Sequence, residues 1–199
     1  SKANIYNNSN GDTRIMASKI KVDQLETADG SGTIALQNQL SGMTTASLPA
    51  LGSAQMPTGS VLQVVHGSYS TSTTTTSGNT WVETGASLAI TPTSASSKIL
   101  VMFNHNIRLY SSSADQGAGY AIRRGTTTVW STPNAYATYI YATSDEADMR
   151  VYQSFNYLDS PNTTSATTYS TRMIEYGNGT TYAQPNSNPT MITLMEIAG

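Results

Sequence analysis

The chain has 199 residues, a formal net charge of −2 and no cysteine. This net charge gives no electrostatic drive toward nucleic acid or an anionic membrane, and the lack of cysteine excludes a disulfide framework and thiolate chemistry. Only 11% of the residues are charged, whereas 12 tyrosines are spread through periodic segments, a composition that favours strands over disorder. No apolar run approaches the roughly 20 residues that span a bilayer, so membrane insertion is not expected.

The N-terminal part of the chain is polar and lacks a core-forming pattern. Residues 1–15 contain a run of Asn, Ser, Gly and Asp that predicts a flexible tail. Residues 16–59 hold two short alternating segments and a connector with Gly and Pro, and neither segment is long enough to bury a core alone. We therefore expect an extended stalk over residues 16–59, ahead of a head domain over residues 60–199.

Residues 60–199 read as roughly eight to ten short strands separated by Gly, Pro and Asn turns, with no convincing helix. The expected strands cover residues 60–66, 80–84, 87–91, 97–110, 119–124, 126–130, 136–141, 149–158, 166–175 and 190–197. Residues 68–79, 111–117 and 176–189 are expected to be loops. This spacing predicts an all-β sandwich or barrel, and a double-sheet jelly roll fits the strand count.

The longest periodic stretch, residues 97–110, is expected to be the central strand. Side chains of a strand alternate between the two faces of its sheet. One face holds Ile99, Val101, Phe103, Ile107 and Leu109, with His105 as the single polar residue. The other face is apolar at first and polar later, and it holds Leu100, Met102, Asn104, Asn106, Arg108 and Tyr110. The first face is expected to be buried in a hydrophobic core. The second face is expected to be half-buried at its start.

Apolar residues on both faces of the strands indicate self-association. Ile192 and Leu194 oppose Met191, Met195 and Ile197 in the last strand in the same way. One sandwich core cannot hide both sets, and symmetric association of identical chains is the simplest cover for the second. The candidate core and subunit-interface residues are Leu100, Met102, Phe103, His105, Ile192 and Leu194.

The two histidines, His66 and His105, give a weak metal signal. Without cysteine or a close histidine pair, a zinc site within one chain is not expected. One histidine per chain could still surround a metal or an anion on a threefold axis. A hydrogen-bonded core or interface residue is the favoured interpretation of His105. No cofactor is expected.

A catalytic interpretation depends on Asp145, Glu146 and Asp148, the densest carboxylates in the chain. Glycoside cleavage needs two acids on either side of one bond. These three residues lie in a short polar segment where solvated charge is the favoured explanation. The many serines have no histidine beside them in a pattern that would activate a nucleophile. We therefore expect the protein not to be an enzyme.

Aromatic residues near polar loops give a candidate sugar-binding surface. Sugar recognition needs an aromatic platform beside hydrogen-bonding groups. One possible set is Trp130, Tyr136, Tyr139 and Tyr141, and another is Tyr176, Tyr182 and Asn178. The competing interpretation, that these rings fill strand faces and subunit contacts, is favoured for residues as amphipathic as tyrosine. The loops over residues 111–117 and 176–189 are expected to form the exposed end.

Four runs of sequence resemble tail-fibre and related virion proteins of tailed bacteriophages, especially marine ones. They are Met16–Ile34, Ile90–Val101, Leu158–Tyr169 and Ile192–Ile197. The resemblance implies a jelly-roll head of the C1q and tumour-necrosis-factor type that forms a trimer about the fibre axis. It also implies that the N-terminal segment binds other virion proteins, and that exposed loops contact a host-surface glycan or protein.

The resemblance makes a trimeric tail-fibre or spike subunit the expected function. In that setting the candidate receptor contacts are Trp130, Tyr136, Tyr139, Tyr176, Asn178 and Tyr182. The protein would be made in the host cytoplasm and would reside on the outside of the tail or capsid. Two alternatives stay open: a head-decoration or tail-assembly subunit without receptor binding, and a glycan-cleaving tip, which is the less favoured.

Overall fold

The computed structural model describes residue 52 and residues 55–76, 78–112, 115–133, 136–142, 146–177 and 179–199. The chain divides into two units, Ser1–Pro49 and Ala50–Gly199, and the described residues all lie in the second. The predicted tail and the predicted stalk up to residue 51 lie outside the described residues. None of the helices found in the described part has the length and apolarity to cross a membrane.

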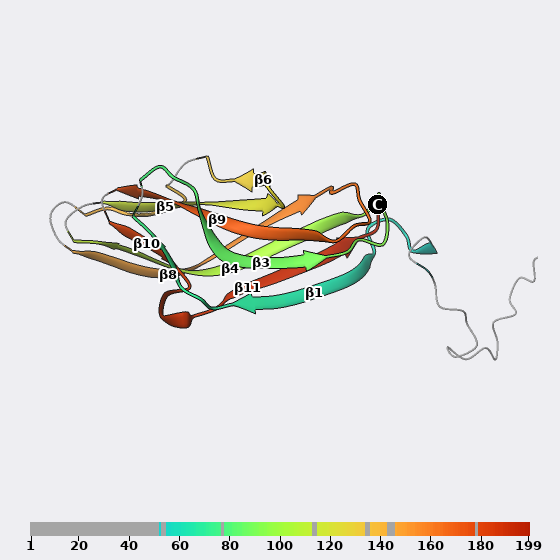
Figure 1. The fold of residues 1–199 in the computed structure, drawn as a ribbon, viewed down its shortest axis with the longest axis horizontal. Coiled ribbons are helices and arrows are strands. Elements are labelled where there is room, and N and C mark those ends of the chain that lie inside the picture. Colours follow the sequence, from blue (N-terminus) through green and yellow to red (C-terminus); the bar gives the residue numbers. More distant parts are fainter. Residues whose placement is uncertain are drawn as a thin grey trace, which may run out of the picture. The chain divides into compact units, whose positions relative to one another are not determined.

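The described residues form an all-β sandwich of two antiparallel sheets (Figure 1). The strands are β1 (Val61–Tyr69), β2 (Thr73–Thr75), β3 (Val82–Ile90), β4 (Lys98–Ser111), β5 (Gln116–Arg124), β6 (Thr127–Ser131), β7 (Thr138–Ile140), β8 (Ala147–Asp159), β9 (Thr167–Gly177), β10 (Thr180–Ala183) and β11 (Thr190–Ile197). A short 3₁₀ helix, η3 (Pro185–Ser187), precedes β11. The predicted all-β class and sandwich architecture are confirmed.

The first sheet is built around β4, which has a partner on both edges. β8 pairs with β4 along nearly its whole length, while β11 and then β10 share the opposite edge. β1 pairs with β11, and β2 pairs with β10. The second sheet has the order β3-β9-β5-β6, with β7 also on β5. The prediction that residues 97–110 form the central strand is therefore confirmed.

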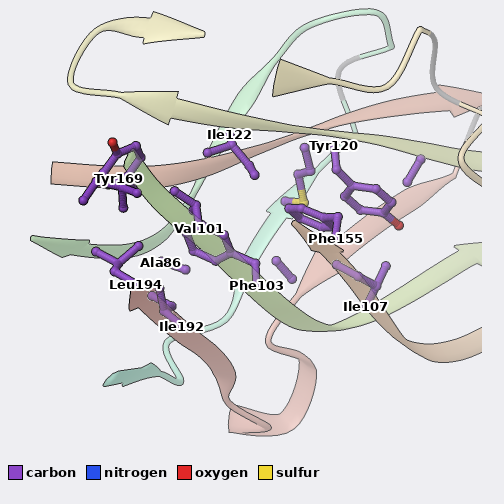
Figure 2. Close-up of a cluster of buried hydrophobic side chains, with 14 of the residues drawn as sticks. Ala86, Val101, Phe103, Ile107, Tyr120, Ile122, Phe155, Tyr169, Ile192 and Leu194 are labelled. Carbon is purple, nitrogen blue, oxygen red and sulfur yellow. The ribbon is translucent and has the colours of Figure 1, made fainter. Parts of the chain in front are cut away.

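The core lies between the sheets, where the inward side chains of β4 meet those of the second sheet (Figure 2). Val101, Phe103 and Ile107 are each at most 2% exposed. The ring of Phe155 stacks on Phe103 at 6.1 Å between centroids and on Tyr120 of the second sheet at 5.5 Å. The alternation in β4 thus puts one apolar face into a shared core, as the period of a strand requires.

A hydrogen-bonded polar chain crosses this core at His105, which is 1% exposed. His105 Nε2 lies 2.8 Å from Thr171 Oγ1, and Nδ1 lies 2.7 Å from Thr190 Oγ1. Thr171 Oγ1 lies 2.6 Å from Thr84 Oγ1. Gln184, with its amide oriented to accept from Thr190, donates to backbone carbonyls. One neutral tautomer of His105 satisfies every link, so the network joins both sheets without a buried charge.

Three sequence predictions about strands were wrong in detail. Residues 80–84 and 87–91 belong to one strand, β3, whose register shifts between Glu83 and Ser87. Gly85 has φ 81 there and lies against the Tyr69 ring, so the Cβ of any other residue would collide with that ring. The expected loops over residues 68–79 and 176–189 contain β2 and β10. These short Thr-rich strands form because β10 extends the edge of β4 beyond the end of β11.

The two ends of the sandwich differ in what they carry. The chain enters beside its own C-terminal end, because Gly59 N–H donates to Ala198 C=O and Ala198 N–H donates to Ser60 C=O, both at 2.8 Å. β4 starts at this end and runs to the opposite one (Figure 1). We call the end with Ser60 and Ala198 the entry end, and the end with Ser111 and Gly177 the far end.

Candidate functional site

Two surfaces of the sandwich are candidates for function, and the first is an apolar row on the outer face of the first sheet. Val64 on β1, Met195 on β11, Leu100 on β4 and Leu158 on β8 are direct cross-strand neighbours in one line. Val64 is 54% exposed and Leu158 is 48% exposed. Four aligned apolar side chains facing outward form a continuous strip across the sheet, a feature that marks interaction surfaces.

The outer face changes character along β4 toward the far end. Next to the apolar row is a hollow of about 200 Å³, lined by apolar and amide side chains: Met102, Asn104, Ser154, Asn156, Met191 and Thr193 among others. Beyond it, Arg108 makes a two-pronged ion pair with Asp148, with both N···O distances 2.8 Å. The Arg108 guanidinium also lies over the rings of Tyr110 and Tyr182. On the outer face of the first sheet, the apolar side chains therefore lie toward the entry end and the charged ones toward the far end.

The second surface is a group of three tyrosines at the far end, on the outer face of the second sheet. The ring of Tyr136 lies 4.4 Å from that of Tyr176 and 5.2 Å from that of Tyr139, measured between centroids. The rings are tilted by 43° to 48° to one another. Tyr136 is 46% exposed and Tyr139 is 36% exposed. We call Tyr136, Tyr139 and Tyr176 the tyrosine cluster.

Strand register explains why these rings meet. Tyr139 on β7 and Tyr176 on β9 both pair with Gly117 on β5. Because Gly117 has no side chain, the two flanking rings approach across it to 6.3 Å. Gly177 has φ 109 and lies against the backbone carbonyl of Asp115, where a Cβ would collide. The glycines thus bring Asp115 and the rings to one spot.

Asp115 holds the cluster at its edge. Its carboxylate accepts a hydrogen bond from the Tyr139 hydroxyl and another from Ala142 N–H at 2.7 Å. The hydrogen bond from Tyr139 keeps the pKa of Asp115 below its usual value, and the same bond raises the pKa of Tyr139 to about 12. A hydrogen bond with Tyr176 raises the pKa of Tyr136. At neutral pH the site therefore presents one carboxylate beside protonated phenols.

A buried polar group lies on the inner side of the same strand ends. Glu175 is 0% exposed, and its Oε1 accepts from Gln116 Nε2 at 3.3 Å. Gln116 also donates to Thr181 Oγ1 and accepts from Gly179 N–H. The other carboxylate oxygen, Oε2, has no hydrogen-bond partner among the described residues. Burial raises the pKa of Glu175.

The predicted core and interface residues divide between the two faces of the first sheet. Phe103, His105, Ile192 and Leu194 are at most 2% exposed and belong to the core. Leu100 and Met102 lie half-buried on the outer face, in and beside the apolar row. The alternation of side chains along each strand was the sequence signal that distinguishes the core residues from those on the outer face.

The predicted receptor contacts do not form one site. Tyr136, Tyr139 and Tyr176 come together, although the sequence placed them in two separate sets. Trp130 instead stacks on Phe155 at 5.3 Å, against the core, and Tyr182 lies beside Arg108 on the other sheet. Asn178 lies outside the described residues. Sequence reasoning missed Asp115, whose only signal was its place at the predicted exposed loop.

The candidate catalytic and metal residues are placed as follows. Asp148 pairs with Arg108, Glu146 is exposed, and Asp145 lies outside the described residues. Both ring nitrogens of His105 are hydrogen-bonded inside the core, and His66 Nδ1 lies 2.9 Å from Thr193 Oγ1. Within the described part of the chain, no three His, Cys, Asp or Glu residues are grouped so that they could hold a metal ion.

Comparisons with known proteins show only a distant similarity. No protein-family model and no curated protein matches the chain. Among solved structures, a mutant VP2 protein of infectious bursal disease virus is 12% identical with a TM-score of 0.35, and a VP2 subviral particle is 13% identical with a TM-score of 0.31. The alignments cover 76% of this chain but only 41% and 42% of those chains. This similarity is too distant to assign the chain to a family or a role.

Proposed function

We propose that the chain is a non-enzymatic structural protein of a tailed-bacteriophage virion, a tail-fibre or spike subunit that forms a homotrimer. Its N-terminal segment binds other virion proteins, and the far end of its β-domain contacts the host surface. The protein is made in the host cytoplasm and resides on the outside of the particle. The resemblance of runs such as Ile90–Val101 supports this setting, and the apolar row carries the assembly.

The nested pairing of the main strands supports a jelly-roll head of the C1q and tumour-necrosis-factor type. With β6 and β7 counted as one edge and β2 and β10 set aside, the described part of the chain has eight main strands. Each pairs with the strand equally far from the other end of the series: β1 with β11, β3 with β9, β4 with β8, and β5 with β6. A long hairpin wrapped around a barrel axis gives this order.

The apolar row supports association of identical chains through the outer face of the first sheet. Val64, Met195, Leu100 and Leu158 form a flat strip that crosses four strands. A strip of this kind loses its contact with water when copies of the face meet around a common axis, and about 25 cal/mol are gained for each Å² of apolar surface buried. Three copies, rather than two, follow from the resemblance.

The arrangement of the two ends supports attachment at one end and contact at the other. The chain arrives at the entry end through Gly59, beside Ala198, so a stalk would leave the sandwich there. The tyrosine cluster lies at the far end (Figure 1 shows the first residues of β5 and the last of β9 at this end). Loops held out by a rigid sandwich are the usual place for recognition.

The oligomeric state of the 199-residue chain tests the assembly. Light scattering coupled to size exclusion at micromolar concentration should give about three times the 21.1 kDa mass of one chain. Leu158→Lys should shift this species to monomer, because Leu158 is 48% exposed in the single chain and a lysine there would place charge in the interface. Thr168→Lys, on the exposed outer face of the second sheet, is the matched control and should remain trimeric.

A monomeric wild type, or a trimer that tolerates Leu158→Lys, would contradict the proposed assembly. Electron microscopy of intact particles with a label on the chain should place it on a fibre or spike. Binding of the purified protein to host cells separates a receptor-contacting fibre from a subunit that serves assembly alone.

A further inference from the structure

The tyrosine cluster has the physical features of a preformed aromatic platform. Tyr139 and Tyr176 are fixed by strand register on either side of Gly117, and the Tyr136 ring makes a tilted contact with both rings. Tyr136 keeps 46% of its surface in water and Tyr139 keeps 36%. Rings held on strands lose little conformational freedom when a ligand arrives, so the contact area is available at low entropic cost.

Asp115 adds a fixed hydrogen-bond acceptor at the edge of the platform. Tyr139 O–H donates to one carboxylate oxygen and Ala142 N–H to the other, and among the described residues these are the hydrogen bonds that Asp115 accepts. Those bonds fix the orientation of the carboxylate before any ligand binds. An acceptor of this kind suits a ligand that offers two neighbouring hydroxyl donors beside an apolar face.

The charge of the site selects against anions. Asp115 is the charged group that acts on Tyr136 and Tyr139, and no lysine or arginine of the described chain contributes to either shift in pKa. Arg108, which stacks on aromatic rings elsewhere, is neutralised by Asp148 on the other sheet. A ligand with its own carboxylate would meet uncompensated repulsion here.

We infer that the tyrosine cluster, with Asp115, binds an uncharged hexopyranose unit of a surface glycan. One face of the sugar ring carries C–H groups that pack on the tyrosine rings, and adjacent hydroxyls donate to the Asp115 carboxylate. A purely apolar side chain fits less well, because covering Asp115 with it would desolvate a carboxylate without supplying donors. This inference deepens the proposed function and rests on it, since it names the ligand of the host-contacting end.

The binding test uses the full chain and simple probes. The methyl glycosides of glucose, galactose and mannose are compared with galacturonate by saturation-transfer NMR and calorimetry. We expect at least one neutral glycoside to bind with a dissociation constant on the order of millimolar, which corresponds to about 4 kcal/mol. Galacturonate is also used as its methyl glycoside, so it differs from the galactose probe only by a carboxylate in place of the hydroxymethyl group, and it should bind more weakly than that probe.

Variants assign the binding to named groups. Tyr136→Ala and Tyr176→Ala should each weaken the affinity about tenfold or more, as expected for loss of a stacked ring. Asp115→Asn should weaken neutral sugars and reduce the discrimination against galacturonate. Tyr152→Ala is the matched control, because Tyr152 is 59% exposed on the first sheet and lies away from the cluster. Thermal unfolding of each variant checks that the fold is retained.

The outcomes separate this inference from the proposed function. If none of the three neutral glycosides binds, or if Tyr136→Ala binds them as well as wild type, the sugar site is wrong. If wild type binds host cells and Tyr176→Ala binds them equally well, the host contact stands but another surface makes it. If neutral glycosides bind through the cluster and host cells do not, the site stands and the host-contacting role fails.

Discussion

His105 and Glu175 are both buried and titratable, but their polar atoms are satisfied to different degrees. His105 lies in the middle of β4, where Thr171 and Thr190 bond its two ring nitrogens. Glu175 lies near the far end of β9, where Gln116 reaches one carboxylate oxygen and the other is buried without a partner among the described residues. The hydrogen bonds of His105 join the two sheets. The unsatisfied oxygen of Glu175, beside the tyrosine cluster, lowers the free energy of unfolding.

The two buried groups contribute differently to the stability of the sandwich. A buried polar group with every hydrogen bond made costs little, while an unsatisfied one costs about 1–3 kcal/mol. The middle of the sandwich therefore favours one arrangement of the two sheets. The far end is predicted to open locally at a lower free energy than the middle, a property common to binding ends of proteins.

Removing His105 should have the largest effect. His105→Ala empties the space beside the Phe103 and Phe155 rings, which lie 5.8 and 5.5 Å from the imidazole, and leaves Thr171 and Thr190 without their partner. We expect the free energy of unfolding to fall by about 3–5 kcal/mol in urea titrations. His66→Ala, on the exposed face of β1, is the control and should change it by less than about 0.5 kcal/mol. Equal effects of the two would refute the central role of the network.

Acid should destabilise the protein through the same residue. Burial lowers the pKa of His105 from 6.5 to about 3. Between these two pH values His105 is protonated in the unfolded chain and neutral in the folded protein. The contribution of His105 to the free energy of unfolding is therefore fully present above pH 6.5 and is lost as the pH falls from 6.5 toward 3, by at most about 1.4 kcal/mol per pH unit. His105→Gln should be less stable at pH 7.5, and its stability should fall less between pH 6.5 and pH 4.5. Parallel curves for the two proteins would show that other groups cause the acid sensitivity.

Neutralising Glu175 should have the opposite sign. Its pKa is raised above 4.5 by burial, so the folded state favours the protonated form and loses stability as the pH rises past the ordinary carboxyl value. Glu175→Gln should increase the free energy of unfolding by about 1 kcal/mol at pH 7.5 and by less at pH 4. Glu146→Gln, at an exposed position, is the control and should show no such gain. A loss of stability at pH 7.5 would mean that the charge is satisfied.

The faces of β4 could be predicted from the sequence, whereas the hydrogen-bond partners of His105 could not. The alternation along residues 97–110 predicted the inner and outer faces of β4, because a period of two with a clear apolar set admits one arrangement. It could not identify Thr171 and Thr190 as partners of His105, since a threonine in a Thr-rich chain reads the same whether it faces water or an imidazole. These partners depend on the pairing of strands far apart in sequence.

Only part of the tyrosine cluster could be predicted from the sequence, for a similar reason. Tyr136 and Tyr139 are neighbours in sequence, and an aromatic patch there could be predicted. Tyr176 joins them only because β5 lies between β7 and β9 and contributes Gly117 to the line. The sequence identified the residue types that suit sugar binding, while the register of three strands decided which of them meet.

The smallest effect is expected at an ion pair on the surface of the far end. Asp148 accepts two hydrogen bonds from Arg108 at 2.8 Å, and these bonds keep the pKa of Asp148 below its usual value. Water solvates both groups, so Asp148→Asn should lower the free energy of unfolding by less than about 1 kcal/mol, and by less still in high salt. Urea titrations at low and high salt measure this. A loss as large as that of His105→Ala would show that an ion pair on the outer face of the first sheet contributes as much to stability as the buried hydrogen-bonded network at His105.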